Sequence, residues 1–196
     1  VILGSLPLFT SLCGSIYLKQ KESFLFWLFS IFGFILIFLF SIFSSSGLNL
    51  KLLMSFNLSD LILFFAVISA SVGYVIGSKL TKELGPLTVI SWALTLSLPI
   101  TLPFSYYEFP SNSIEQSSWF AFFYLAIMSQ WIGYLFWYKG LSLGGAVKIG
   151  QVQLIYPFAS FVFSIFLLNE KLNLFTFFFS VLILGIIYLT KRFSKN

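Results

Sequence analysis

Histidine is absent from this sequence of 196 residues, and cysteine occurs only once, at Cys13. A single cysteine excludes a disulfide within the chain, and the sequence has no Cys or His spacing typical of a metal site. Cys13 lies within an apolar run, where a free cysteine behaves as a small hydrophobic residue. We therefore expect no metal ion and no cofactor.

Charge is also scarce in this sequence. Only 9% of the residues are charged and 59% are hydrophobic, whereas soluble domains carry about 25% charged residues. A soluble core could not bury this much Phe, Leu and Ile, because surface grows too fast relative to volume. A bilayer accepts such side chains, so the composition indicates an integral membrane protein. The net charge of +5 does not indicate nucleic-acid binding, because the cations are dispersed between apolar runs.

Apolar runs long enough to cross a bilayer recur along the chain. An uncharged helix of about 20 residues spans the hydrocarbon core. None of the runs carries Asp, Glu, Lys or Arg near its middle, and continuous apolarity favours helices over alternating strands. The sequence thus predicts an all-α, polytopic helical membrane protein with seven spans, at residues 1–18, 24–43, 61–78, 86–104, 119–138, 149–168 and 173–190.

The positions of Lys and Arg predict how the chain is oriented. If the C-terminus is cytoplasmic, nine of the eleven cations lie in cytoplasmic segments, and only Lys51 and Lys171 lie outside. The outer loop 105–118 holds Glu108 and Glu115 and no cation. Because cytoplasmic loops carry the excess of Lys and Arg, we expect a multi-pass protein of the cytoplasmic (inner) membrane with a cytoplasmic C-terminus.

The sequence repeats itself at an offset of 150 residues. Pro7 then aligns with Pro157, Lys21 with Lys171, Ser30 with Ser180 and Thr10 with Ser160. In both copies a span is followed by a short charged hinge and another span. Five spans separate the copies, so they cross the membrane in opposite directions, an arrangement typical of secondary transporters.

The repeat also predicts how the chain is divided. Residues 1–50 are expected to be the last two transmembrane helices of a first repeat, and residues 51–196 a second repeat of five. Counterparts of residues 59–138 would precede Val1. We therefore expect roughly 90–100 further residues with three spans, and an intact protein of about 290 residues with ten spans.

Four stretches carry a resemblance to a known family. At 73–96 a span ends in a basic hinge and the next opens with Gly85 and Pro86. At 133–173 a Trp- and Tyr-rich segment leads through a turn into a span with a central Pro157, closed by Glu170. The other two stretches are a last span with a basic tail, 174–193, and a second Pro-containing span, 6–23.

In these stretches, which cover about half of the chain, the sequence resembles the EamA-type branch of the drug/metabolite transporter superfamily. It departs from the pattern at Gln20, which stands where the other copy has Glu170. The resemblance implies ten helices, cytoplasmic termini and the export or exchange of small molecules.

Polar groups within the predicted spans are the candidates for function, because they normally face other helices or a cavity. Gln153, Pro157, Ser160 and Ser164 share one face of their span. Gln153 faces either a substrate cavity or a fixed partner helix. Pro157 frees the carbonyl of Gln153, which produces a kink, a hinge or an acceptor for a ligand. Gln151 lies nearer the cytoplasmic end and is expected to be solvated.

The other spans contribute further candidates. Gln130 and Tyr134 are four residues apart and share a face, and Trp92 lies deep enough for its N–H to need a partner. Small residues spaced four apart allow two helices to pack closely. At such residues, helix packing is therefore the alternative to a binding site. The cavity candidates are Gln130, Tyr134, Gln153, Trp92, Tyr74 and Pro157, and the helix-packing candidates are Ser69, Gly73, Gly77, Ser160 and Ser164.

The function predicted is that of an EamA-type secondary transporter working by alternating access. It would move a small metabolite or drug-like solute, with amino-acid-like solutes among the options, and export is the favoured direction. The alternative is a non-transporting membrane subunit or anchor that assembles with another protein. An enzyme is not expected, because no catalytic set of residues is visible. The partners expected are the lipid bilayer and a small-molecule solute, with a homodimer as an alternative assembly and no nucleic acid.

Overall fold

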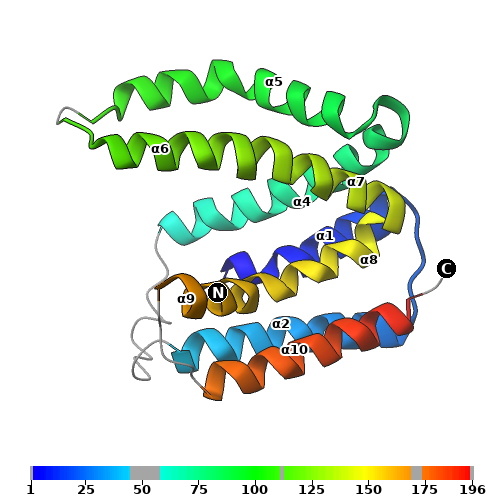
Figure 1. Ribbon diagram of the computed structural model, residues 1–196. Coiled ribbons are helices and arrows are strands. Elements are labelled where there is room, and N and C mark those ends of the chain that lie inside the picture. The colour runs from blue at the N-terminus through cyan, green and yellow to red at the C-terminus, as the bar shows by residue number, and fades with distance from the viewer. Residues whose placement is uncertain (1, 45–57, 111–112, 169–173, 195–196) are drawn as a thin grey trace. The chain divides into compact units, whose positions relative to one another are not determined.

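The computed structural model describes residues 2–44, 58–110, 113–168 and 174–194. Every regular element in these ranges is a helix (Figure 1), which confirms the predicted all-α class. The 3₁₀ segments are η1 and η3, and η2 is π-helical. The elements are η1 (Ile2–Ser5), α1 (Leu6–Tyr17), α2 (Phe24–Ser44), α4 (Leu58–Leu84), α5 (Pro86–Tyr107), α6 (Gln116–Tyr124), η2 (Leu125–Gly133), α7 (Tyr134–Gly144), α8 (Ala146–Gly150), η3 (Gln151–Ile155), α9 (Tyr156–Leu168) and α10 (Leu174–Arg192).

The long apolar helices confirm a polytopic membrane protein. Five described segments have the length and composition to cross a bilayer: Leu58–Leu84, Pro86–Tyr107, Gln116–Gly144, Ala146–Leu167 and Leu174–Arg192. They match the last five predicted spans. The first two predicted spans correspond to the shorter apolar helices Ile2–Tyr17 and Phe24–Phe40, so their crossing of the bilayer stays a prediction. The many exposed Phe, Leu and Ile side chains suit contact with lipid.

Contacts group the chain into two units. The first comprises Val1–Val75 with Gly144–Asn196, and the second comprises Ile76–Leu143. These units describe which helices pack together, whereas the predicted halves 1–50 and 51–196 describe a repeat in the sequence. The division into repeats therefore stays a prediction.

In the first unit, α2 lies beside α10, its counterpart at the 150-residue offset. α1 packs against α8 and η3, the two segments that precede its own counterpart α9. Figure 1 shows that the two members of each pair run in opposite directions. The helix starts keep the offset: α2 begins at Phe24 and α10 at Leu174, while α1 begins at Leu6 and α9 at Tyr156. Both α1 and α9 follow directly on a 3₁₀ segment.

Hydrogen bonds repeat with the same offset. Ser30 Oγ donates to the carbonyl of Phe26 at 2.8 Å in α2, and Ser180 Oγ donates to the carbonyl of Thr176 at 2.7 Å in α10. Such bonds satisfy a hydroxyl within its own helix. The two copies therefore share local structure as well as element boundaries.

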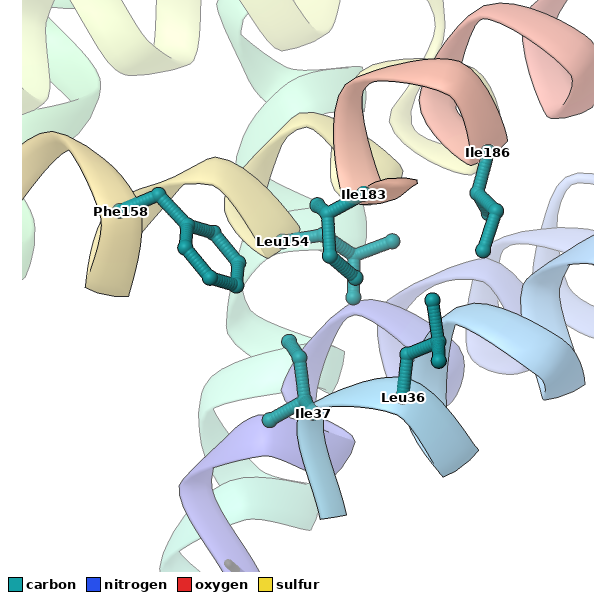
Figure 2. Packing of buried hydrophobic residues seen from close by; sticks show 6 residues of the cluster. All are labelled: Leu36, Ile37, Leu154, Phe158, Ile183 and Ile186. Atoms are coloured by element: carbon teal, nitrogen blue, oxygen red, sulfur yellow. The ribbon is translucent and has the colours of Figure 1, made fainter. Parts of the chain in front are cut away.

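A hydrophobic cluster joins α2 and α10 to the middle of the broken helix formed by α8, η3 and α9. It consists of Leu36, Ile37, Leu154, Phe158, Ile183 and Ile186 (Figure 2). Gly33 allows the close approach, because a Cβ atom at this position would lie 3.0 Å from Leu154 Cδ1 and 3.3 Å from Ile186 Cγ2. Between helices in a bilayer, close packing of this kind is a main source of stability.

The second unit contains the end of α4, then α5, and the long helix formed by α6, η2 and α7. Gly77 lies directly against the ring of Tyr138, which leaves no room for a side chain at residue 77. Ser78 Oγ donates to the carbonyl of Leu141 at 3.4 Å. Gly85, with φ of 81°, separates α4 from α5 and occupies a conformation that favours glycine.

The cluster in Figure 2 leads to a test of stability. Ile183 is 0% exposed, whereas its neighbour Leu184 is 50% exposed. Ile183→Ala should lower the free energy of unfolding by about 2–5 kcal/mol, because the contacts of a buried side chain are lost and a cavity remains. Leu184→Ala should change it by no more than about 0.5 kcal/mol. Unfolding of the purified protein in detergent measures both, and equal losses would contradict this packing.

Candidate functional site

The helix that begins at Ala146 changes its hydrogen bonding in the middle of its length. At η3 the N–H of Gln151 donates to the carbonyl of Lys148, three residues back, and the N–H of Tyr156 donates to the carbonyl of Gln153. Pro157 has no N–H, so it cannot supply the α-helical bond to the Gln153 carbonyl. The 3₁₀ bond from Tyr156 satisfies that carbonyl instead.

The tightened segment is fastened to α1 by the side chain of Ser11. The Ser11 hydroxyl donates to the carbonyl of Val147 at 2.8 Å and accepts a hydrogen bond from Gln151 Nε2 at 2.7 Å. Gln151 Nε2 also donates to the carbonyl of Pro7 at 3.3 Å. The Val147 carbonyl is the one that an α-helical N–H at Gln151 would reach, so Ser11 replaces the bond that the 3₁₀ turn removes.

The environment of Gln151 differs from the prediction. The sequence predicts a solvated side chain, but the side chain is 2% exposed. That expectation is wrong because the amide is used by Ser11 and Pro7 of α1, which lie about 140 residues away in the sequence.

Thr10 extends the polar contacts of α1. Its hydroxyl donates to the carbonyl of Leu6 at 2.8 Å, and its Oγ1 lies 3.4 Å from Oγ of Ser71 in α4. Gly150 permits this approach, because a Cβ atom there would lie 2.9 Å from Thr10 Cγ2. Thr10, Ser11, Ser71 and Gln151 are all buried. We call these four residues the α1 polar cluster.

Gln153 lies beside this cluster in sequence but differs from it in its bonding. Its side chain is 4% exposed, and neither its Oε1 nor its Nε2 has a hydrogen-bond partner in the described part of the chain. Oε1 of Gln151 is also without a partner there. Leaving such groups buried and unpaired costs about 1–3 kcal/mol each. Among the described buried side chains of this unit, Gln153 therefore has the most unused hydrogen-bonding capacity.

The other predicted cavity residues are divided between the two units. Tyr74 is half-buried in the first unit. Pro157 lies in α9, and its side chain is outside the described residues, as is Glu170. Their role in a cavity stays a prediction.

In the second unit, Trp92 is 59% exposed on α5 and Gln130 is exposed on η2. Trp131 Nε1 donates to Ser91 Oγ at 3.3 Å, which joins the two helices that carry these residues. Tyr134 is half-buried, with its ring centroid 6.2 Å from that of Tyr138. The structure thus places Gln130 and Trp92 on neighbouring helices, and their part in a site also stays a prediction.

The predicted packing residues lie in varied surroundings. Gly77 lies against Tyr138, whereas nothing lies within 4 Å of a Cβ atom built at Gly73. Ser69 and Ser160 are exposed. Ser164 Oγ donates to the carbonyl of Phe161 at 2.9 Å in its own helix.

Metal-ligating side chains do not gather in the described part of the chain. Within those residues, no three His, Cys, Asp or Glu side chains form a group that could hold a metal ion. The candidate site therefore consists of neutral hydrogen-bonding groups.

Comparison with known proteins points to one family. Residues 57–192 match the EamA-like transporter family. An uncharacterized transporter, YdeK, from Bacillus subtilis is 32% identical over 197 residues, which are 100% of this chain and 66% of that protein. An uncharacterized inner membrane transporter, YicL, from Salmonella typhimurium is 28% identical over 145 residues, which are 72% of this chain and 48% of that protein.

A third relative, an uncharacterized transporter from Archaeoglobus fulgidus, is 25% identical over 118 residues, which are 59% of this chain and 41% of that protein. No solved structure matches the chain. The chain thus spans less than two thirds of the length of each of these three relatives.

The bonds of Ser11 lead to a second test of stability. Ser11→Ala should lower the free energy of unfolding by about 1–3 kcal/mol, because it leaves the Val147 carbonyl and the Gln151 amide less well paired. Thr95→Ala is the matched control, since the exposed Thr95 hydroxyl bonds only the carbonyl of Ser91 in its own helix. It should change stability by no more than about 0.5 kcal/mol. Equal effects of the two substitutions on unfolding in detergent would rule out the proposed importance of Ser11.

Proposed function

This chain belongs to the EamA-like transporter family, and from that premise we propose that it forms part of a secondary transporter. The transporter moves a small metabolite or drug-like solute across the cytoplasmic membrane by alternating access, in the direction of export. The observation that carries this proposal is the antiparallel packing of α1 against α8 and η3, and of α2 against α10.

Inverted packing of this kind supports alternating access. Two copies of one motif that face opposite sides of the membrane can exchange conformations, so that a site between them opens first to one side and then to the other. Substrate sites of such carriers typically lie where a helix is discontinuous. The 3₁₀ segment η3, which carries Gln151 and Gln153, is a discontinuity of that kind.

The full site draws on several helices in this proposal. The residues proposed to contact the solute are Gln153, Tyr74 and Pro157 in the first unit and Gln130, Tyr134 and Trp92 in the second. Residues 1–50 are the end of one repeat, and residues 51–196 are a second repeat. The intact protein then has ten spans, and its C-terminus is cytoplasmic because Lys191, Arg192 and Lys195 cluster there.

Transport by the purified protein tests the proposal directly. Proteoliposomes loaded with mixed amino acids, nucleosides or small aromatic solutes should exchange at least one of them faster than liposomes without protein. If the protein is inserted and shows a cooperative unfolding transition but moves none of these solutes, the proposal fails. That result would favour a membrane subunit or anchor that transports nothing.

Labelling of introduced cysteines tests the orientation. Cys13→Ser removes the single native thiol, so that one new cysteine can be labelled at a time. In whole cells a membrane-impermeant maleimide should label Glu108→Cys, at the end of α5, and should label Asn196→Cys only after the membrane is opened. The reverse pattern would contradict a cytoplasmic C-terminus.

A further inference from the structure

Two neighbouring amides of η3 differ in how they are paired. Gln151 Nε2 makes two hydrogen bonds to α1, whereas both polar atoms of the Gln153 amide lack a partner in the described part of the chain. Both side chains are more than nine-tenths buried. An amide that stayed unpaired in this way would only destabilise the protein, so a group outside these residues must satisfy it for part of the time.

The broken helix that carries this amide holds little charge. Lys148 is the only charged residue between residues 146 and 168, and it lies five residues before Gln153. The described acidic residues Glu22, Asp60, Glu83, Glu108 and Glu115 lie at helix ends or in connections. A cation at Gln153 would therefore lose its hydration without gaining a counter-charge from these acids.

The shape of an amide limits what can pair with it. Gln153 presents a carbonyl acceptor and an N–H donor side by side in one plane. Another carboxamide, or the lactam edge of a heterocycle, presents the complementary donor and acceptor and can form two bonds at once. A carboxylate offers acceptors only, so one of its oxygens would face the carbonyl of Gln153.

We propose that the Gln153 amide recognises the solute, and that the solute is a molecule of zero net charge with a carboxamide or lactam group. This inference rests on the proposed transport function and names the substrate class for it. Because the Gln153 polar atoms are shielded in this conformation, the solute reaches them when the helices around η3 separate during alternating access. Gln151 keeps η3 on α1 through Ser11 and is a positioning residue.

Matched solute pairs test the inference in proteoliposomes containing the intact protein. The pairs are nicotinamide and nicotinate, glutamine and glutamate, and asparagine and aspartate, with uracil as a lactam. We expect at least one carboxamide or lactam to be transported ten times faster than a carboxylate. Gln153→Met should reduce that transport at least tenfold without lowering the midpoint temperature of unfolding, because it breaks no described hydrogen bond.

Two control variants separate recognition from folding. Gln151→Met should lower the midpoint temperature, because it removes the bonds to Ser11 and Pro7. Gln116→Met, at an exposed position where α6 begins, should change neither transport nor unfolding.

Two results would overturn the inference while transport itself stands. In the first, the protein transports solutes but prefers no carboxamide or lactam to a carboxylate. In the second, Gln153→Met matches the unaltered protein for every solute, so that trapped water or another part of the protein satisfies the amide. If the folded protein transports nothing, the proposed function fails instead. Calorimetry then measures whether the protein binds nicotinamide, glutamine, asparagine or uracil. Binding that Gln153→Met abolishes supports the inference, whereas binding of none of the four overturns it.

Discussion

The N–H group that Pro157 lacks interrupts the helix next to η3, the segment at which α1, α2 and α10 of the first unit meet. Without that donor the Gln153 carbonyl takes its bond from Tyr156, and the helix tightens into η3. The tightening frees the Val147 carbonyl, which Ser11 of α1 then satisfies. One missing hydrogen bond within the helix is thus replaced by hydrogen bonds between helices. Such replacement is required inside a membrane protein, because no water is available there to satisfy the backbone groups.

The same constraint acts twice in the chain. Pro7 lies in the first turn of α1, directly after η1, as Pro157 lies in the first turn of α9, directly after η3. The two copies are not equivalent in chemistry, because Gln153 corresponds to Leu3, which is exposed. The equivalent helices α2 and α10 are held against η3 by the cluster around Leu154 and Ile183, and of the segments η1 and η3 only η3 carries amide side chains. That asymmetry gives the proposed solute one defined place to bind.

The sequence predicted the helical class, the positions of the longer helices and the 150-residue offset, because each depends on local composition or on spacing along the chain. The helix ends were less accurate, since the span predicted at 61–78 is the helix Leu58–Leu84. The environment of Gln151 depends instead on contacts with another helix. Distance from the end of a span suggested solvent, but the 3₁₀ turn directs the amide toward Ser11, and no periodicity in the sequence reveals that partner. The sequence did contain one indication of a buried polar contact. Thr10 and Ser11 are polar residues within an apolar run, and they lie close to Pro7. Gln153 was singled out correctly as a buried amide, but its lack of a partner only emerges once the neighbouring helices are in place.

A double-mutant cycle between Pro157 and Ser11 tests this central constraint most directly. If Pro157 imposes the 3₁₀ turn that leaves the Val147 carbonyl to Ser11, then Pro157→Ala restores the N–H that an α-helix pairs with the Gln153 carbonyl. The relaxed segment then lets the N–H of Gln151 return to the Val147 carbonyl. Ser11→Ala should then cost about 1 kcal/mol less in the Pro157→Ala background than in the unaltered protein. An equal cost in both backgrounds, within about 0.3 kcal/mol, would show that the two residues act independently and would contradict the account.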